Sequence, residues 1–163
     1  MSWTRIWKKS KRFYGWRHVD RACNNLACKY DHFLPKRIIA LARGGLVPAT
    51  IIANKLGVRH IHSLGLASYE MSSDGIERPG EFNLYQALPT NAPRMNPDDV
   101  VLIVDDISDK GTTFKYAKEY IKQIVGGTVV TMSLTIKPET QFKPDYYDEV
   151  VDQEQWLVFP WEK

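Results

Sequence analysis

Cysteine is scarce in this chain, and long apolar runs are absent. The two cysteines, Cys23 and Cys28, have the spacing of neither a CxxC redox motif nor a metal-ligand pair. Two reduced cysteines fit a reducing compartment. No apolar run approaches the ~20 residues that span a bilayer, and residues 1–17 lack the apolar core of a signal peptide. We therefore expect a cytoplasmic protein without a disulfide framework.

A strong charge of either sign is also missing. The net charge of +3 suits an anionic ligand without requiring nucleic acid. Basic residues gather in an arm at 1–17, where they alternate with aromatic side chains. We expect this arm to pack on the remaining domain, residues 18–163, or on a neighbouring subunit. Binding of single-stranded nucleic acid is the alternative interpretation, because aromatic and basic residues together favour it.

Short aliphatic runs alternate with helical patterns along the chain. The spacing of apolar residues predicts helices at 18–30, 49–56 and 112–125, and strands at 37–42, 58–69, 100–104, 128–137 and 149–152. Such alternation indicates right-handed crossovers and a parallel sheet covered on both faces. The sequence therefore predicts an α/β fold with a parallel twisted sheet flanked by helices.

Three polar segments directly follow predicted strands. They are Ala42–Gly45, Asp105–Thr113 and Lys137. In open α/β sheets, ligands bind at the carboxyl ends of the strands. These segments are therefore the candidates for the functional site.

The segment Asp105–Thr113 carries the most specific chemistry. Two adjacent carboxylates, Asp105 and Asp106, end an aliphatic strand. Their repulsion, about 1 kcal/mol or more near the surface, calls for a metal ion, hydroxyl donors or a cation. The turn Lys110–Thr113 supplies backbone N–H groups, hydroxyls and a helix N-terminus, which together form an anion site.

The stretch Val101–Thr113 resembles the phosphoribosyl-pyrophosphate signature of type I phosphoribosyltransferases. The shared pattern is an aliphatic strand, two acids, two spacers and Asp-x-Gly-x-Thr. The resemblance implies that Asp105 and Asp106 hold the ribose hydroxyls and reach Mg²⁺. It implies that the 5′-phosphate is enclosed by Asp109, Lys110, Gly111, Thr112 and Thr113. Lys110 replaces a small hydroxyl residue that is common there, and it either adds charge to the phosphate or points to water.

Two further segments resemble parts of the same family. Arg43, Gly44 and Gly45 match its pyrophosphate loop, where glycine allows backbone N–H groups to turn toward the diphosphate. Ser68 and Tyr69 begin a polar stretch, at about 69–99, that matches its mobile hood. A hood excludes water from the activated sugar. An ordinary insertion is the alternative for this stretch.

The C-terminal part most resembles bacterial xanthine-guanine (hypoxanthine) phosphoribosyltransferases. That resemblance implies that Lys137 donates to the O6 of a purine. It also implies that Trp156 stacks on the base in a short C-terminal base-binding segment, and that the backbone at Leu157 reads the purine 2-position. The alternatives are a solvated lysine at a strand end and a tryptophan in the core or an interface.

The expected activity is transfer of a phosphoribosyl group from phosphoribosyl pyrophosphate to N9 of a 6-oxopurine, with Mg²⁺ and with Asp109 as general acid or base. The products are a nucleotide and pyrophosphate, as in purine salvage. Two alternatives remain, a regulator that senses the donor and an enzyme for another base. The family resemblance also implies a homo-oligomer, a dimer or larger, without a membrane or nucleic-acid partner.

Overall fold

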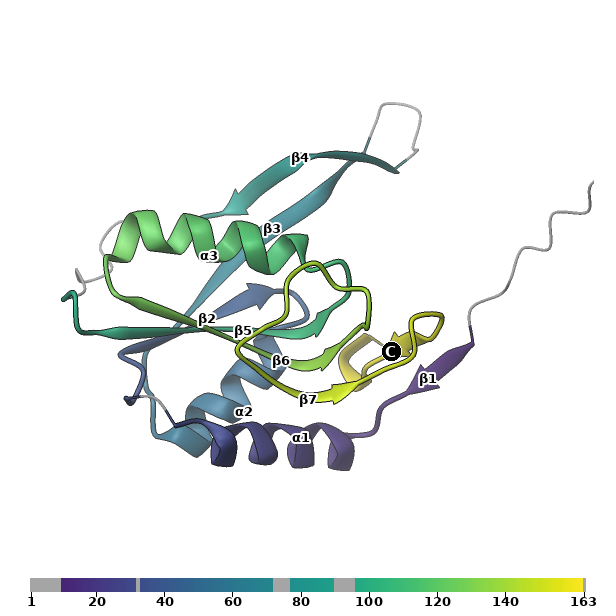
Figure 1. Cartoon of the computed structure of the whole chain (residues 1–163), viewed down its shortest axis with the longest axis horizontal. Coiled ribbons are helices and arrows are strands. Elements are labelled where there is room, and N and C mark those ends of the chain that lie inside the picture. The colour runs from purple at the N-terminus through teal and green to yellow at the C-terminus, as the bar shows by residue number, and fades with distance from the viewer. Residues whose placement is uncertain (1–9, 32, 72–76, 90–95, 163) are drawn as a thin grey trace, which may run out of the picture.

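The computed structural model describes residues 10–31, 33–71, 77–89 and 96–162 (Figure 1). Its elements, in chain order, are β1 (Lys11–Phe13), α1 (Trp16–Lys29), β2 (Arg37–Ala42), α2 (Leu46–Leu56), β3 (Ile61–Met71), β4 (Glu77–Gln86), β5 (Val100–Ser108), α3 (Thr112–Val125), β6 (Thr128–Ile136), β7 (Tyr146–Val150), β8 (Trp156–Val158) and a 3-10 turn at Pro160–Glu162.

The main sheet has six strands in the order β4-β3-β2-β5-β6-β7. Neighbours from β3 to β7 pair in parallel, and β4 alone runs antiparallel to β3. This arrangement confirms the predicted parallel α/β fold. It also brings the carboxyl ends of β2, β5 and β6 to one edge, where the ligand-binding segments follow.

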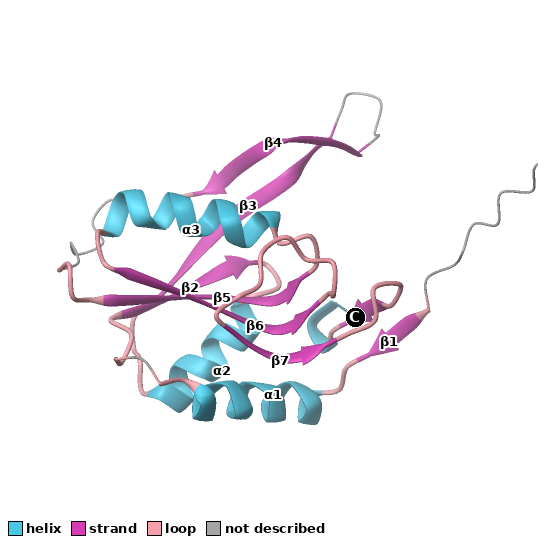
Figure 2. Cartoon of the chain, viewed as in Figure 1, coloured by secondary structure: helices cyan, strands magenta, loops and turns pink. Residues whose placement is uncertain are grey.

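Helices cover both faces of the sheet. Figure 2 shows α3 over one face and α1 and α2 over the other. Along β2, Ile38 and Ala40 pack toward α1 and α2, whereas Ile39 and Leu41 pack toward α3. Because successive residues of a strand point to opposite faces, a strand buried on both faces must be apolar throughout. This requirement explains the continuous aliphatic runs of β2 and β5.

The stretch 69–99, expected as a long loop, contains strand β4. β4 pairs with β3 around two register shifts. Its sequence includes Pro79, charged residues and a glycine, which are the residues that an edge strand tolerates and a central strand does not. The pattern therefore carried no strand signal. The expected hood also includes 72–76 and 90–95, which lie outside the described residues.

A second, two-stranded sheet joins the two ends of the described chain. β1 pairs in parallel with β8, so that Lys11, Arg12 and Phe13 lie opposite Trp156, Leu157 and Val158. In Figure 1 this pair lies beside the C-terminus, next to the β7 edge of the main sheet. Part of the expected N-terminal arm is thus a structural element of the domain.

Within the described ranges, no helix has the length and apolar character needed to cross a membrane.

The α3 side of the core depends on one aromatic side chain. Phe114 is 1% exposed, and its ring stacks on Phe142 with the centroids 6.0 Å apart. We expect Phe114→Ala to lower the free energy of unfolding by about 3–5 kcal/mol, because it leaves a cavity in a packed core. The matched control is Phe33→Ala, since Phe33 is 85% exposed, and we expect a change within about 0.5 kcal/mol. Denaturant unfolding measures both, and equal effects would contradict this account of the core.

Candidate active site

A cavity of about 690 Å³ opens at the carboxyl ends of the central strands. It lies where the loops after β2 and β5 meet β3 and the C-terminal turn. Its lining residues are Ala42, Arg43, Gly44, Leu66, Ala67, Asp105, Asp106, Thr113, Trp161 and Glu162. The structure therefore brings the predicted pyrophosphate loop and the predicted ribose-binding acids to one cavity.

The two aspartates at the end of β5 lie against each other. The Asp106 backbone N–H donates to Asp105 Oδ1 at 2.9 Å. Burial raises the pKa of the Asp105 carboxyl well above its ordinary value, and the charge of Asp106 adds to this rise. Burial likewise raises the pKa of Asp106 to about 6, reinforced by the charge of Glu162 and opposed by hydrogen bonding with Asp105 and Ile107. A positive charge or hydroxyl donors placed beside the pair would therefore stabilise the ionised carboxylates.

Gly44 brings the loop after β2 directly onto this pair. A Cβ atom at Gly44 would lie 2.4 Å from Asp106 Oδ2, and one at Gly45 would lie 2.3 Å from the carbonyl oxygen of Val104. Side chains are therefore excluded at both positions by contact with β5. The peptide bond between Ala42 and Arg43 is cis. The Tyr85 hydroxyl on β4 donates to the Ala42 carbonyl at 3.1 Å, which ties the loop to the edge strand.

A smaller cavity of about 210 Å³ adjoins the first and shares Asp105 and Thr113 with it. Its wall is the loop that leads into α3, formed by Asp109, Lys110, Gly111, Thr112 and Thr113 together with neighbouring β5 residues. Gly111 has a φ of 82° at the N-cap of α3, a conformation that glycine adopts without strain. The backbone N–H groups of this first turn and the positive end of the helix dipole suit an anion such as phosphate.

Lys137, at the end of β6, is buried and fully engaged. Only 3% of the residue is exposed. Its Nζ donates to the backbone carbonyls of Asp152 and Gln155 at 2.5 Å each, and to that of Gln153 at 3.3 Å. The alternative of a solvated lysine is therefore wrong. In the structure, the ammonium group holds the turn that leads into β8.

The predicted base-binding residues lie on β8, outside the lining of both cavities. Trp156 is 57% exposed, and Leu157 is buried. The aromatic and acidic residues that do reach the aspartates are Trp161 and Glu162, in the 3-10 turn that follows. These two residues were not among the predicted site residues. The sequence shows a second tryptophan followed by an acid near its end. These two residues could not be assigned to the site because their position depends on how the C-terminal turn folds back.

Ser68 and Tyr69 lie in β3, and their side chains are outside the described part of the chain. β3 reaches the site through Leu66 and Ala67, the residues just before them.

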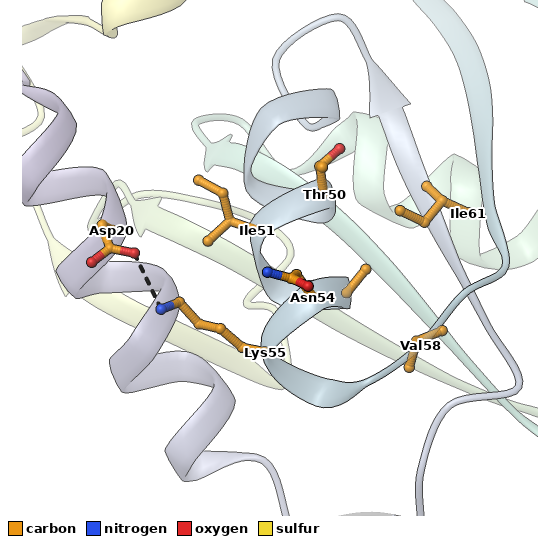
Figure 3. A pocket seen from close by; sticks show the side chains of 8 residues that line it. Asp20, Thr50, Ile51, Asn54, Lys55, Val58 and Ile61 are labelled. Carbon is orange, nitrogen blue, oxygen red and sulfur yellow. Dashed lines mark ion pairs between the residues drawn. The ribbon is translucent and has the colours of Figure 1, made fainter.

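A further cavity of about 530 Å³ lies away from this chemistry (Figure 3). It is formed at the last turns of α2 and the start of β3, at the opposite end of α2 from Gly44. An ion pair between Lys55 and Asp20, 3.1 Å apart, lies at its rim. Its lining combines apolar side chains with Thr50, Asn54 and this paired charge.

The fold and the site together define an α/β protein whose cavities at the carboxyl edge of the sheet present paired carboxylates and a helix N-terminus, groups that suit hydroxyls and phosphate. The model of the phosphoribosyl transferase domain family matches residues 15–162. The chain belongs to this family.

Known relatives match the chain over most of their length. A xanthine-guanine phosphoribosyltransferase of Desulfotalea psychrophila is 30% identical, over 99% of this chain and 84% of the relative. One from Idiomarina loihiensis is 29% identical, over 96% and 90%. A solved structure of a purine phosphoribosyltransferase from Pyrococcus horikoshii superimposes with a TM-score of 0.79 at 32% identity, covering 94% of this chain and 95% of that one.

The contact between Gly44 and Asp106 gives a first test of the site. We expect Gly44→Ala to lower the rate of phosphoribosyl transfer by more than about tenfold. The added methyl group must push the loop or the carboxylate out of place, and the resulting strain costs more than about 1 kcal/mol. Gly15→Ala is the matched control, since nothing lies within 4 Å of its Cβ position. Steady-state turnover and thermal unfolding of both variants are the measurements. Full activity of Gly44→Ala would show that catalysis does not require the close contact between this loop and Asp106.

The raised pKa of Asp106 predicts a pH dependence of stability in the ligand-free protein. The folded protein holds this proton up to a pKa of about 6, whereas the ordinary value is 3.8. The proton's contribution to stability is therefore present below the ordinary value and is lost as the pH rises through about 6. We expect the free energy of unfolding of the wild type to fall over this window relative to Asp106→Asn. Parallel pH profiles of the two proteins in urea denaturation would contradict the prediction.

Proposed function

We propose that the chain transfers the 5-phosphoribosyl group of phosphoribosyl pyrophosphate to N9 of a 6-oxopurine, giving a purine nucleotide and pyrophosphate. The observation that carries this proposal is the buried Asp105–Asp106 pair between a glycine loop and a phosphate-sized cavity at a helix N-terminus. Family membership supports the donor. The names of the relatives support a purine acceptor.

The donor fits this arrangement group by group. Ribose 2′- and 3′-hydroxyls would donate to Asp105 and Asp106, whose raised pKa values reflect a shortage of compensating partners. The 5′-phosphate would occupy the smaller cavity, against the N–H groups of Gly111–Thr113. The diphosphate would lie at Arg43 and Gly44, where the guanidinium offers a charged fork. Lys110 is exposed at the rim of the smaller cavity, so its charge would act on the phosphate from solvent.

Mg²⁺ fits the same carboxylates. The described residues form no group of three or more His, Cys, Asp or Glu side chains that could hold a metal ion by themselves. Mg²⁺ commonly binds through one or two carboxylates together with substrate phosphates, and Asp105 and Asp106 supply hard oxygen ligands of that kind. When bound, the ion would neutralise charge on the departing diphosphate.

The acceptor side is formed by the C-terminal segment. We propose that Trp156 stacks on the purine and that the backbone at Leu157 contacts its 2-position. Lys137 would donate to O6 after exchanging one of its three carbonyl partners for the base. In the base-free state its ammonium group orders the turn 152–155, which precedes Trp156.

In the reaction, the bond between the anomeric carbon and the diphosphate breaks, and N9 of the base forms the new bond to that carbon. Positive charge builds at the anomeric carbon, as in glycosyl transfer generally. The base loses one proton, and Asp109, exposed in the wall of the smaller cavity, would accept it from N7 as general base. A hood over the site, including Ser68 and Tyr69, would exclude water from the activated sugar.

The oligomeric state and the cellular location are predictions from the sequence. We propose a homo-oligomer, at least a dimer, in the cytoplasm. Nucleic acid is an unnecessary partner, because the last residues of the basic arm that the structure describes are engaged with the domain itself.

Turnover with each candidate base tests the proposal. Purified protein is given phosphoribosyl pyrophosphate and Mg²⁺ with guanine, xanthine, hypoxanthine, adenine or orotate, and product formation is followed spectrophotometrically. We expect turnover with one or more of the 6-oxopurines. Donor binding by calorimetry without turnover on any base would instead favour the donor-sensing regulator.

Asp109 has a matched control. We expect Asp109→Ala to lower turnover by about a hundredfold or more while donor binding persists, the usual size of a general acid–base contribution. Asp98→Ala removes an equally exposed carboxylate outside both cavities and is expected to keep wild-type turnover. Near-normal turnover of Asp109→Ala would remove its proton-transfer role.

A further inference from the structure

The N-terminal strand is joined to the segment that would contact the purine. β1 and β8 pair in register from Lys11 opposite Trp156 to Phe13 opposite Val158. At the two ends of this ladder, Trp156 N–H donates to the Ser10 carbonyl at 2.8 Å, and Tyr14 N–H donates to the Val158 carbonyl at 2.9 Å. The backbone of β8 is therefore held along its length by residues 10–14. In the described chain β8 belongs to this pair and to no strand of the main sheet.

β1 is in turn anchored to the edge of the main sheet. The Arg12 guanidinium lies 2.6 Å from Glu149 on β7. The same carboxylate accepts a hydrogen bond from the Tyr14 hydroxyl at 3.0 Å, and His18 Nε2 lies 3.4 Å away. Burial opposes the charge of Glu149, yet these contacts, with Arg12 foremost, lower its pKa. The carboxylate is thus ionised and shared by three partners from the first turns of the chain.

An aromatic stack continues from this anchor to the aspartates. The Tyr14 ring lies 4.9 Å from that of Phe159, and Phe159 stacks on Trp161 at 4.9 Å with an interplanar angle of 4°. Trp16, in the first turn of α1, lies 6.1 Å from Trp161. Trp161 lines the cavity that contains Asp105 and Asp106. A shift of β1 would therefore move β8 directly, whereas Trp161 is also held by its packing against the hydrophobic core.

We propose that Arg12 is a positioning residue for the acceptor base. Through Glu149 it fixes β1, and through β1 it fixes β8 at the site where the purine stacks. The inference rests on the proposed transfer reaction. Its expected signature is selective, because the donor-binding loops follow β2 and β5 and make no pairing with β1. Loosening β1 should weaken the purine and spare phosphoribosyl pyrophosphate.

The test is the steady-state kinetics of Arg12→Leu with the purine that the wild type uses best. We expect the KM for the purine to rise about tenfold, as for loss of one charge-assisted contact. The KM for phosphoribosyl pyrophosphate and the kcat at saturation should stay within about twofold. Arg12→Lys should recover part of the purine KM, because an ammonium group can still reach Glu149 without the planar fork.

Lys11→Leu is the matched control. It removes the same charge from the neighbouring position of the same strand, where the side chain is exposed and points away from Arg12's side. We expect wild-type kinetics. Glu149→Gln keeps the shape of the acceptor and removes its charge, so it should reproduce the purine KM of Arg12→Leu. The double variant Arg12→Leu/Glu149→Gln should show no further rise if the two residues act as one unit.

A purely stabilising role for β1 gives a different result. Partial unfolding lowers the concentration of active protein, so kcat falls while both KM values stay constant. That outcome, or an unchanged purine KM in both Arg12→Leu and Glu149→Gln, overturns the inference while the wild-type activity stands. Should Arg12→Leu fail to fold, Glu149→Gln decides by the same criterion. An inactive wild type overturns the proposed function, and the inference falls with it.

Discussion

Two carboxylates placed side by side at the end of a buried strand are the constraint on which this site depends. β5 is aliphatic up to Val104, because both of its faces are covered, and the next two residues, Asp105 and Asp106, lie near the carboxyl end of the strand, where they line the cavity. Burial raises both pKa values, and the charge of Asp106 adds to the rise at Asp105, whereas that of Glu162 adds to the rise at Asp106. Gly44 leaves room for the Asp106 carboxylate because it has no side chain, and Trp161 lies in the wall of the same cavity. A ligand would have to supply the remaining stabilisation of the two carboxylates, and hydroxyl groups and a divalent cation can both do so.

The sheet supplies this geometry because each loop of the site comes from a different strand. The glycine loop follows β2, the two acids lie near the end of β5, the loop that leads into α3 follows β5, and Lys137 follows β6. Parallel pairing of these strands brings the loops together without any loop having to be long. Hydrogen bonds between the loops complete the arrangement: Thr135 Oγ1 donates to the Asp106 carbonyl at 3.2 Å, and Gln141 N–H donates to the Lys110 carbonyl at 3.0 Å.

Prediction from the sequence succeeded where a pattern is local and failed where it is not. The bounds of β2 and α3 were correct, because an aliphatic run and an amphipathic helix ended by Gly126 are both local signals. β4 was not predicted because it is a polar edge strand. β1 and β8 were not predicted because strands of three residues form only through their pairing with each other. For the same reason Trp161 and Glu162 could not be assigned to the cavity. The burial of Lys137 was equally invisible, since its carbonyl partners belong to a turn that only the folded chain brings near.

Donor and acceptor recognition therefore rest on different kinds of structure. Most of the proposed donor site lies in one short stretch from β5 to α3, where strand, acids and helix N-terminus follow one another, and the glycine loop after β2 completes it. The acceptor segment takes its position from contacts across nearly the whole chain, such as the pairing of Lys11 with Trp156 and of Arg12 with Glu149. On this proposal, β1 and Glu149 act on the purine, whereas the sugar donor is bound by segments with which β1 does not pair.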